Sequence, residues 1–456
     1  MHAAHASETG MRPSACPGLL RIVAARDGGI CRIKLPGGAL RADQANAIAD
    51  ASDEYASGVI ELTNRANLQL RGVRAGHEAA LIGALLSAGL GPTGDAAADD
   101  VRNLMISPTA GRDPLALFDT TTLAADILSL LQSEPHFAAL SPKFAMMLDG
   151  GERLAMVEHP HDVWFCAMPA VQGAKHVRFA FGFAGCPPID GAPSDSAALA
   201  AIAPDQVVPT VAALLRTFLE LATPDQSRMR DLLTTYDAEI ILTHAQRNLG
   251  FPLQRDASVT AWRRPAADPS LRFGMHAQMH AHTSYVGAQA SLGRIDTATL
   301  RELAAISHAC AGGMLHVTPW QGIVLPDVDT AIAPDVLARV AALGLACSAD
   351  DPFARVIACA GSTGCAKSLA DTKADAQRLA TCLPDGVADI HLTGCLRSCA
   401  AAHRAAWTLL AQAPGIYDLY RRDDTQPGPG ACVAHHLTIE QAADALARLA
   451  RSPIDA

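Results

Sequence analysis

The chain has 456 residues, of which half are apolar and 18% are charged, and its formal net charge is −10. This composition predicts a folded globular protein of about two to four domains and excludes an intrinsically disordered chain. The acidic balance argues against a nucleic-acid-binding protein, because no domain-wide excess of Lys and Arg is present to neutralise phosphates.

The sequence contains no run of about eighteen uncharged apolar residues, so no membrane-spanning helix is predicted. The N-terminus lacks a basic segment followed by an apolar one, which is the pattern of a secretory signal. We therefore expect a cytoplasmic protein. Its twelve cysteines are too dilute for a disulfide scaffold. In a reducing compartment, clustered cysteines more often bind metal.

Two segments repeat one pattern of predicted elements: strand, helix, strand, turn, strand, helix. They span residues 31–90 and 286–345 and are offset by 255 residues. The offset aligns Gly58 with Gly313, Thr63 with Thr318, and Leu70 with Leu325. A repeat of this length indicates two related halves, each opening with a small α+β unit in which helices cover one face of a sheet.

In the first repeat, polar side chains alternate with apolar ones along the strand predicted after Thr63. A period of two would place four of them on one face: Arg65, Asn67, Gln69 and Arg71. An isolated strand of this kind most often presents a solvated outer face. The equivalent positions of the second repeat, however, are apolar or small: Trp320, Gly322, Val324 and Pro326. This asymmetry favours a binding role for the first-half strand.

A larger region follows each repeat, and the two regions have a parallel spacing of notable residues. Arg102 and Lys143 are 41 residues apart in the first region, and Cys359 and Cys399 are 40 apart in the second. We interpret these positions as the same two loops, which carry cations in one half and thiols in the other.

Four cysteines lie together near the C-terminus in a C-x5-C and a C-x3-C pattern: Cys359, Cys365, Cys395 and Cys399. Each pair follows a predicted strand and lies among small residues, so backbone N–H groups can approach the sulfurs and stabilise an anionic cluster. The spacing fits neither paired zinc knuckles nor the cysteine run of small ferredoxins. It favours a [4Fe–4S] cluster, with a structural zinc site and four buried structural thiols as alternatives. For the other eight cysteines we expect apolar packing.

The cysteine spacing, the internal repeat and the segment TNRANLQLRGV (residues 63–73) together resemble the sulfite and nitrite reductase superfamily. This resemblance implies an α+β, pseudo-two-fold repeated nitrite/sulfite reductase-like fold, with two ferredoxin-like half-domains and two larger α/β domains for cluster and substrate. The polar segment 255–270 is predicted to link the halves. The implied domains in chain order are 12–95, 100–255 (without a cluster), 271–350 and 352–456 (with the [4Fe–4S] cluster).

Within that superfamily, residues 12–38 (RPSACPGLLRIVAARDGGICRIKLPGG) and 318–328 (TPWQGIVLPDV) resemble the precorrin-3B synthase family. The resemblance implies a cobalamin-pathway monooxygenase that uses O2 to convert precorrin-3A to precorrin-3B. The reaction hydroxylates carbon C20 and forms a lactone from the ring A acetate. The resemblance also implies a mononuclear non-haem iron beside the [4Fe–4S] cluster, an external electron-donor protein and NADH as the ultimate reductant.

By the same resemblance, the residues predicted to bind substrate are Arg65, Asn67, Gln69, Arg71, Arg102 and Lys143. The sirohaem reductases carry a second Lys at the position of Ala145. Its absence weakens the reductase interpretation, since sulfite reduction needs concentrated positive charge. Arg71 replaces the His of the family and adds a guanidinium that can grip a carboxylate bidentately.

Two histidine-rich segments are candidate ligands for the mononuclear iron: EHPHD at residues 158–162, and residues 275–285 with His276, His280 and His282. Two other function classes stay open. One is a sirohaem-dependent sulfite or nitrite reductase, and sirohaem is expected only in that case. The other is a non-catalytic iron–sulfur or zinc protein, such as an electron carrier, which would not need the polar stripe of the first half.

Overall fold

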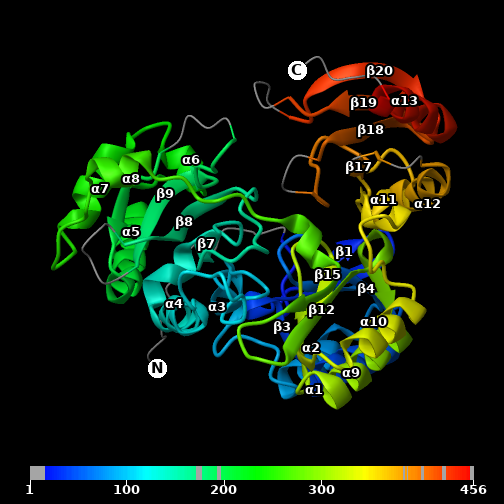
Figure 1. The fold of residues 1–456 in the computed structure, drawn as a ribbon, viewed down its shortest axis with the longest axis horizontal. Coiled ribbons are helices and arrows are strands. Elements are labelled where there is room, and N and C mark those ends of the chain that lie inside the picture. The colour runs from blue at the N-terminus through cyan, green and yellow to red at the C-terminus, as the bar shows by residue number, and fades with distance from the viewer. Residues whose placement is uncertain are drawn as a thin grey trace, which may run out of the picture.

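The computed structural model describes residues 16–170, 177–192, 197–383, 386–387, 389–401, 405–423 and 428–451. Residues 12–15 of the first predicted domain and 452–456 of the last lie outside this described part. Within it, the strands form four five-stranded sheets (Figure 1). No helix in the same residues combines the length and apolar character needed to cross a membrane.

The two repeats exchange strands, so each of the first two sheets contains one strand from the other repeat. The sheet orders are β1-β2-β5-β4-β13 and β11-β12-β15-β14-β3. Both exchanged pairs are antiparallel: Ile295 of β13 pairs with Ile60 of β4, and Leu315 of β14 pairs with Leu40 of β3. The strand bounds are β1 (Val23–Ala25), β2 (Gly28–Ile33), β3 (Ala39–Arg41), β4 (Val59–Leu62), β5 (Leu68–Val73), β11 (Gly274–Ala277), β12 (Thr283–Gln289), β13 (Arg294–Asp296), β14 (Met314–Val317) and β15 (Gly322–Asp329).

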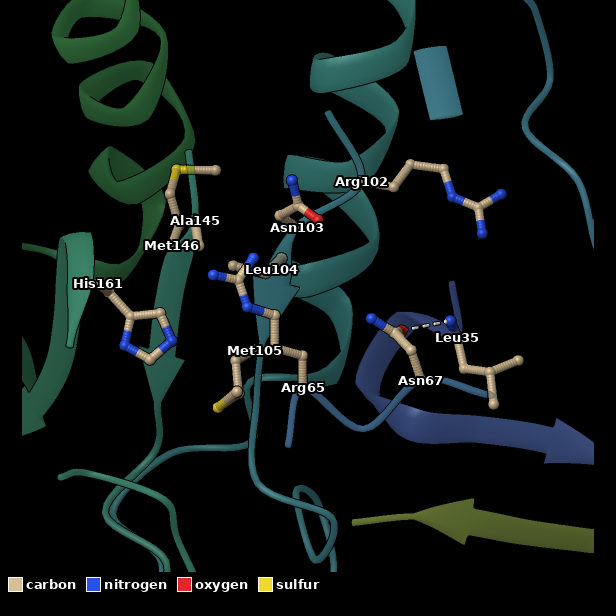
Figure 2. Close-up of a pocket in the computed structure, with 10 residues that line it drawn as sticks. All are labelled: Leu35, Arg65, Asn67, Arg102, Asn103, Leu104, Met105, Ala145, Met146 and His161. Atoms are coloured by element: carbon tan, nitrogen blue, oxygen red, sulfur yellow. Dashed lines mark hydrogen bonds between the residues drawn. The ribbon is translucent and has the colours of Figure 1, made fainter. Parts of the chain in front are cut away.

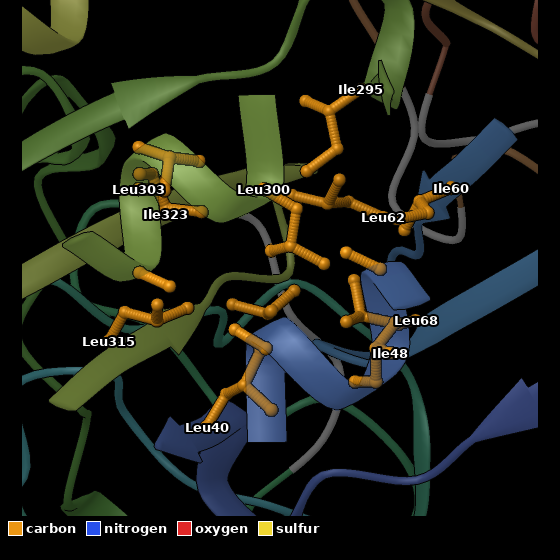
Figure 3. Packing of buried hydrophobic residues seen from close by; sticks show 14 of the residues in the cluster. Leu40, Ile48, Ile60, Leu62, Leu68, Ile295, Leu300, Leu303, Leu315 and Ile323 are labelled. Carbon is orange, nitrogen blue, oxygen red and sulfur yellow. The ribbon is translucent and has the colours of Figure 1, made fainter. Parts of the chain in front are cut away.

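One apolar core serves both repeats (Figure 3). Helix α1 (Ala42–Tyr55) buries Ala45, Ile48 and Ala49, which lie on one helical face, and α9 (Thr297–Cys310) buries the residues 255 positions later. Each fully buried leucine or isoleucine contributes about 1.5–3 kcal/mol. Gly58 and Gly313 have φ of 77° and 76°. The predicted internal repeat is therefore confirmed down to the backbone.

The first large region contains a mixed sheet in the order β10-β9-β8-β7-β6. Strands β6, β7 and β8 are parallel, β9 is antiparallel to β8, and β10 is antiparallel to β9. Helices α4, α5 and α7 supply buried residues to its core. The bounds are β6 (Leu104–Met105), β7 (Met146–Asp149), β8 (His161–Met168), β9 (Arg178–Gly185), β10 (Ala200–Ile202), α4 (Thr121–Ser133), α5 (Val207–Leu221) and α7 (Ala238–Gln246).

The C-terminal region repeats this topology in the order β16-β17-β18-β19-β20. Again the first three strands are parallel, β19 is antiparallel to β18, and β20 is antiparallel to β19. Its bounds are β16 (Val356–Ala358), β17 (Ile390–Thr393), β18 (Trp407–Ala413), β19 (Ile416–Arg421), β20 (Ala431–Leu437), α11 (Gly361–Gly364), α12 (Thr372–Cys382) and α13 (Ile439–Arg451). The remaining helices are α2 (Glu78–Ser87), α3 (Ala96–Asp100), α6 (Met229–Leu232), α8 (Ala257–Ala261) and α10 (Ala333–Ala342), with short 3-10 turns at η1 (Pro36–Gly38), η2 (Pro135–Ala139), η3 (Pro204–Gln206), η4 (Pro269–Arg272), η5 (Ser291–Gly293) and η6 (Pro352–Ala354).

This shared topology corrects one sequence-based interpretation. By their place in the sheets, β6 and β7 are the counterparts of β16 and β17. Arg102 and Lys143 come before β6 and β7, whereas Cys359 and Cys395 come after β16 and β17. The prediction that cations and thiols occupy the same two loops is therefore wrong: they lie at opposite ends of equivalent strands. Equal spacing along a chain does not specify which end of a strand a residue occupies.

The segment predicted to link the halves is held by a buried ion pair. Arg264 donates to both oxygens of Asp149, at 3.0 and 2.8 Å, and also to the backbone oxygen of Glu152. The Glu152 carboxyl group is fully buried, accepts the Gly150 N–H at 2.9 Å and leaves Oε1 without a partner. Burial and the charge of Asp149 raise the pKa of Glu152 to about 8.

The raised pKa predicts how stability depends on pH. The folded chain keeps a proton on Glu152 that the unfolded chain releases, so this residue destabilises the fold progressively as the pH rises from about 4.5 to about 8. Glu152→Gln should leave stability nearly unchanged at pH 5 and should raise it relative to the wild type at pH 8.5, by on the order of a few kcal/mol. Urea midpoints of both proteins at the two pH values would test this. A difference between the proteins that does not change with pH would contradict it.

Candidate functional site

A small recess, partly open to solvent, lies where the turn between β4 and β5 meets the starts of β6, β7 and β8 (Figure 2). Three of the six residues predicted to bind substrate line it: Arg65, Asn67 and Arg102. The other lining residues are Leu35, Asn103, Leu104, Met105, Ala145, Met146 and His161. The first repeat and the first large region therefore build this recess together.

Arg65 and Asn67 lie in a turn, and the predicted continuous strand face is wrong for both. Strand β5 begins only at Leu68, and Ala66 has a φ of 55°. Thr63 Oγ1 closes the turn by accepting the N–H groups of Arg65 and Asn67, at 3.3 and 3.1 Å. The left-handed residue breaks the alternation of side chains. It allows the Asn67 side chain to accept the Leu35 N–H at 2.9 Å.

The Arg65 guanidinium extends into the recess (Figure 2). Among the described residues, none accepts a hydrogen bond from it. Burial and the positive charges of Arg32 and Arg228 lower its pKa to about 10, so it stays charged at neutral pH. A partly buried cation without a carboxylate partner is costly, and an anionic ligand would relieve that cost.

Two further cations lie beside Arg65. Arg102 is 8% exposed; it donates to the backbone oxygen of Lys34 at 2.5 Å, and its Nε has no partner. Lys34 is also buried and donates to the backbone oxygens of Asp99 and Asp100, at 2.7 and 2.9 Å. Burial lowers the pKa of Lys34 to about 7. Arg65 and Arg102 therefore bring positive charge to a recess whose lining contains no carboxylate, and Lys34 behind them is only partly protonated at neutral pH.

His161 lines the recess opposite these cations and carries no charge. The residue is 2% exposed, and its Nδ1 has no hydrogen-bond partner. Burial, followed by the charge of Arg65, lowers the pKa of His161 to about 3. A neutral imidazole has one N–H donor and one acceptor nitrogen, so it can hydrogen-bond to a ligand that the arginines hold.

The other predicted substrate residues lie outside the lining of the recess. Lys143 is exposed, two residues before Ala145, which does line it. Gln69 accepts hydrogen bonds from Arg32 at 3.1 and 2.7 Å and donates to Glu61. Arg71 is also engaged within the protein, and its partners are described below.

Arg32 and Lys34 also contribute positive charge near the recess, although neither was among the residues predicted to bind substrate. Arg32 lies in β2 and Lys34 directly follows it, so the two alternate with Cys31 and Ile33. The same period of two that drew attention to the later strand was therefore present here. His161 was considered only as part of the EHPHD segment, as a possible iron ligand.

The four clustered cysteines lie in the two loops that follow β16 and β17. Cys359 Sγ accepts the Gly394 N–H at 3.3 Å and lies 3.3 Å from Thr372 Oγ1. A Cβ atom on Gly394 would collide with Ser368, so only glycine fits at position 394. N–H donors to sulfur are typical of sites that stabilise anionic thiolates.

The spacing of these thiols distinguishes the metal centres that they could hold. Burial and the other three cysteines together raise the pKa of Cys399, so the four lie within electrostatic range of one another. All four are described, and no three of their sulfurs lie within 4.8 Å of each other. A single zinc ion would draw four sulfurs to about 3.8 Å apart, because the Zn–S bond is about 2.3 Å. A [4Fe–4S] cluster needs the wider arrangement, because each thiolate binds a different iron.

The histidine segment at residues 275–285 does not form a metal site with neighbouring residues. His276 Nε2 is hydrogen-bonded to the backbone oxygen of Phe273 at 2.7 Å. Across the described residues, the one group of three potential ligands is Asp418, Cys432 and His435. There Cys432 Sγ is 3.6 Å from both ring nitrogens of His435, so it is not directed at the lone pair of either nitrogen.

The chain is similar to known proteins in family, in sequence and in fold. A model of the nitrite/sulfite reductase ferredoxin-like half domain matches residues 24–88 and 276–343. A model of the nitrite and sulphite reductase 4Fe-4S domain matches residues 97–253. The second match supports an iron–sulfur cluster, but the matched residues include none of the four clustered cysteines.

Among curated proteins, the chain is 27% identical over 415 residues to a precorrin-3B synthase from Sinorhizobium sp, covering 90% of this chain and 83% of that protein. It is 28% identical over 396 residues to the chloroplastic ferredoxin–nitrite reductase of Zea mays, covering 81% of this chain and 67% of that protein. The solved structure of the Mycobacterium tuberculosis NirA protein aligns with a TM-score of 0.76 at 21% identity, over 93% of this chain and 80% of that one. With the family matches, this confirms the predicted fold, including both ferredoxin-like half-domains.

Replacing any one of the four clustered cysteines by serine is expected to lower the iron and sulfide content of protein purified without oxygen. Each thiolate holds a different iron in a [4Fe–4S] cluster. Cys382→Ser is the matched control, because Cys382 is an exposed cysteine on α12 that lies outside the group. An equal loss in the control, or stoichiometric zinc without sulfide, would contradict the cluster.

Proposed function

Because the chain belongs to the nitrite and sulfite reductase superfamily, we propose that it is a superfamily oxidoreductase that acts on a tetrapyrrole. The reaction is the O2-dependent conversion of precorrin-3A to precorrin-3B in cobalamin biosynthesis. The likeness to a precorrin-3B synthase, which extends over 90% of the chain, motivates this choice. The single observation that carries it is the recess, whose cations are spread apart and lack carboxylate partners.

Precorrins carry many carboxylates around a large ring, and the recess suits such a ligand. Arg65 offers charged donors to the recess that no described residue accepts, and the buried Nε of Arg102 also has no partner. Charge-assisted hydrogen bonds from a guanidinium to a carboxylate are roughly twice as strong as neutral ones. In this proposal the two arginines bind and orient substrate carboxylates, and neutral His161 accepts a hydrogen bond from the same ligand.

The residue at position 145 separates the two candidate chemistries. Ala145 lines the recess, and its N–H donates to Asp162 at 2.8 Å. A lysine there would concentrate positive charge on a small anion such as sulfite or nitrite. With alanine, the wall is apolar and uncharged at this point.

The oxidation balances with an external reductant. One atom of O2 becomes the hydroxyl oxygen of the product and the other leaves as water, while NADH, the ultimate donor, supplies two electrons and is oxidised to NAD+. When bound at the four cysteines, an iron–sulfur cluster supplies one-electron transfer. The described residues bring no two histidines and a carboxylate together. We therefore assign no ligands to a mononuclear iron and derive no step through it.

A sirohaem-dependent nitrite reductase is the second candidate. It is favoured by the similarity to ferredoxin–nitrite reductases, which extends over 81% of the chain. It would use the same recess and the same four cysteines. It differs in requiring bound sirohaem and in consuming nitrite, not O2.

The deciding experiment is an absorption spectrum of anaerobically purified protein, followed by incubation with precorrin-3A, a reductant and 18O2. We expect a cluster spectrum without tetrapyrrole bands, and a product that gains one 18O atom by mass spectrometry. A strong Soret band with a chlorin-type band, together with nitrite consumption, would replace this proposal by the reductase.

Arg65→Gln is expected to raise the KM for precorrin-3A at least about tenfold, with a smaller change in kcat, because a lost charge-assisted hydrogen bond costs about 1.5–3 kcal/mol. Iron and sulfide content should not change. Arg339→Gln makes the same change of charge at an exposed position on α10 and is the control. Equal KM values for the two variants would remove Arg65 from the substrate site.

A further inference from the structure

The loops that carry the four cysteines are held from outside by the first repeat. Arg26 donates to the backbone oxygen of Ser362 at 2.9 Å, and Arg71 donates to that of Gly364 at 2.9 Å. Asn64 donates to the backbone oxygen of Cys399 at 3.3 Å. These contacts cross about 300 residues of sequence and join the half that lacks the cysteines to the half that has them.

Of the three donors, Arg71 is the buried one. Its side chain is 4% exposed, whereas Arg26 is exposed. Arg71 binds Asp27 through two hydrogen bonds of 2.7 and 2.8 Å and Glu61 through one of 3.2 Å. Burial opposes its charge, but these carboxylates raise the pKa of Arg71, so the guanidinium stays positive. It is therefore a fixed charge in a fixed orientation.

The CAGSTGC segment fits around this guanidinium. A Cβ atom on residue 364 would lie 2.5 Å from Arg71 Nη2, so only glycine lets the arginine reach the backbone there. Gly361, at the other end of α11, has a φ of 72°, and a Cβ there would lie 2.9 Å from the Thr372 nitrogen. Both glycines between Cys359 and Cys365 are thus explained by close contacts of the loop.

The charges around Arg71 do not cancel. Its partner Glu61 also accepts two hydrogen bonds from Arg294, at 2.9 and 2.8 Å. Lys373 donates to the backbone oxygens of Leu292 and Ala358, and Ala358 directly precedes Cys359. Three cations therefore face two carboxylates, Asp27 and Glu61. This excess positive charge lies next to the first cysteine loop. A cluster held there by four thiolates would be negatively charged.

We propose that Arg71 is a positioning residue for the iron–sulfur cluster, which fixes the Cys359–Cys365 loop through Gly364 and stabilises the reduced cluster with a buried positive charge. On reduction the cluster gains one electron from the external donor, and its negative charge grows. A fixed cation nearby favours that change and raises the reduction potential. This inference rests on the proposed assignment of the cluster to the four cysteines, and it gives Arg71 a role other than substrate binding.

The test is a redox titration, monitored by electron paramagnetic resonance, of the full-length, cluster-loaded protein and three variants. Arg71→Gln should shift the potential to more negative values. Asp27→Asn keeps the bond between Arg71 and Gly364 but removes one negative charge, so it should shift the potential the other way. Arg26→Gln, which removes the exposed contact to Ser362, should leave the potential nearly unchanged because solvent screens its charge.

The outcomes separate this inference from the cluster assignment. If the wild type contains no iron and sulfide, the cluster assignment fails. If it is loaded and neither Arg71→Gln nor Asp27→Asn shifts the potential, or both shift it in one direction, the role of Arg71 is overturned. If Arg71→Gln alone loses its cluster while Arg26→Gln and Asp27→Asn stay loaded, the positioning role is supported.

Discussion

The contact between the two halves of this protein depends on the carboxylate of Glu61. It lies on β4, is 8% exposed, and accepts hydrogen bonds from Arg294 of the exchanged strand β13 and from Arg71 of β5. Although burial alone would raise the pKa of Glu61, the charges of Lys373, Arg71 and Arg294 lower it, so the group is ionised. Without this carboxylate the buried Arg71 guanidinium and the partly exposed Arg294 guanidinium would lose their shared anionic partner, and removing the partner of a buried charge costs several kcal/mol. One residue thus stabilises both the strand exchange and the docking of the cysteine loops.

The two repeats have the same backbone conformation at equivalent turns, but these turns carry side chains with different roles. The turn from Thr63 to Asn67 has a counterpart 255 residues later with the same backbone hydrogen bonds, and Thr318 Oγ1 accepts the Gly322 N–H as Thr63 Oγ1 accepts that of Asn67. In the first repeat this turn carries Arg65 into an open recess. In the second it carries Trp320, which is 6% exposed and packs in an apolar cluster with Met105 and Tyr285. The same geometry therefore provides a polar site in one half and apolar support for that site in the other.

Membership of the superfamily explains the architecture, but it does not choose the substrate, because one fold can serve several chemistries. In this chain the choice depends on local features of the recess. The cations come from three different elements, namely the end of β2, the turn before β5 and the segment before β6. They are therefore spread around the recess. An anionic ligand with several separated carboxylates matches that distribution better than a single small anion.

The sequence by itself determined the internal repeat and the spacing of the four cysteines, because both can be read along one chain, and the fold class followed from the resemblance of these features to the superfamily. It also pointed to Arg65, Asn67 and Arg102, which the structure brings together. Tertiary structure alone decided the rest. The left-handed Ala66 moved Arg65 off the strand face, strand order showed that Arg102 and Cys359 lie at opposite ends of equivalent strands, and Arg71 was placed beside Gly364 and not in the recess. Each of these depends on contacts between residues far apart in the chain, and spacing along a sequence carries no record of them.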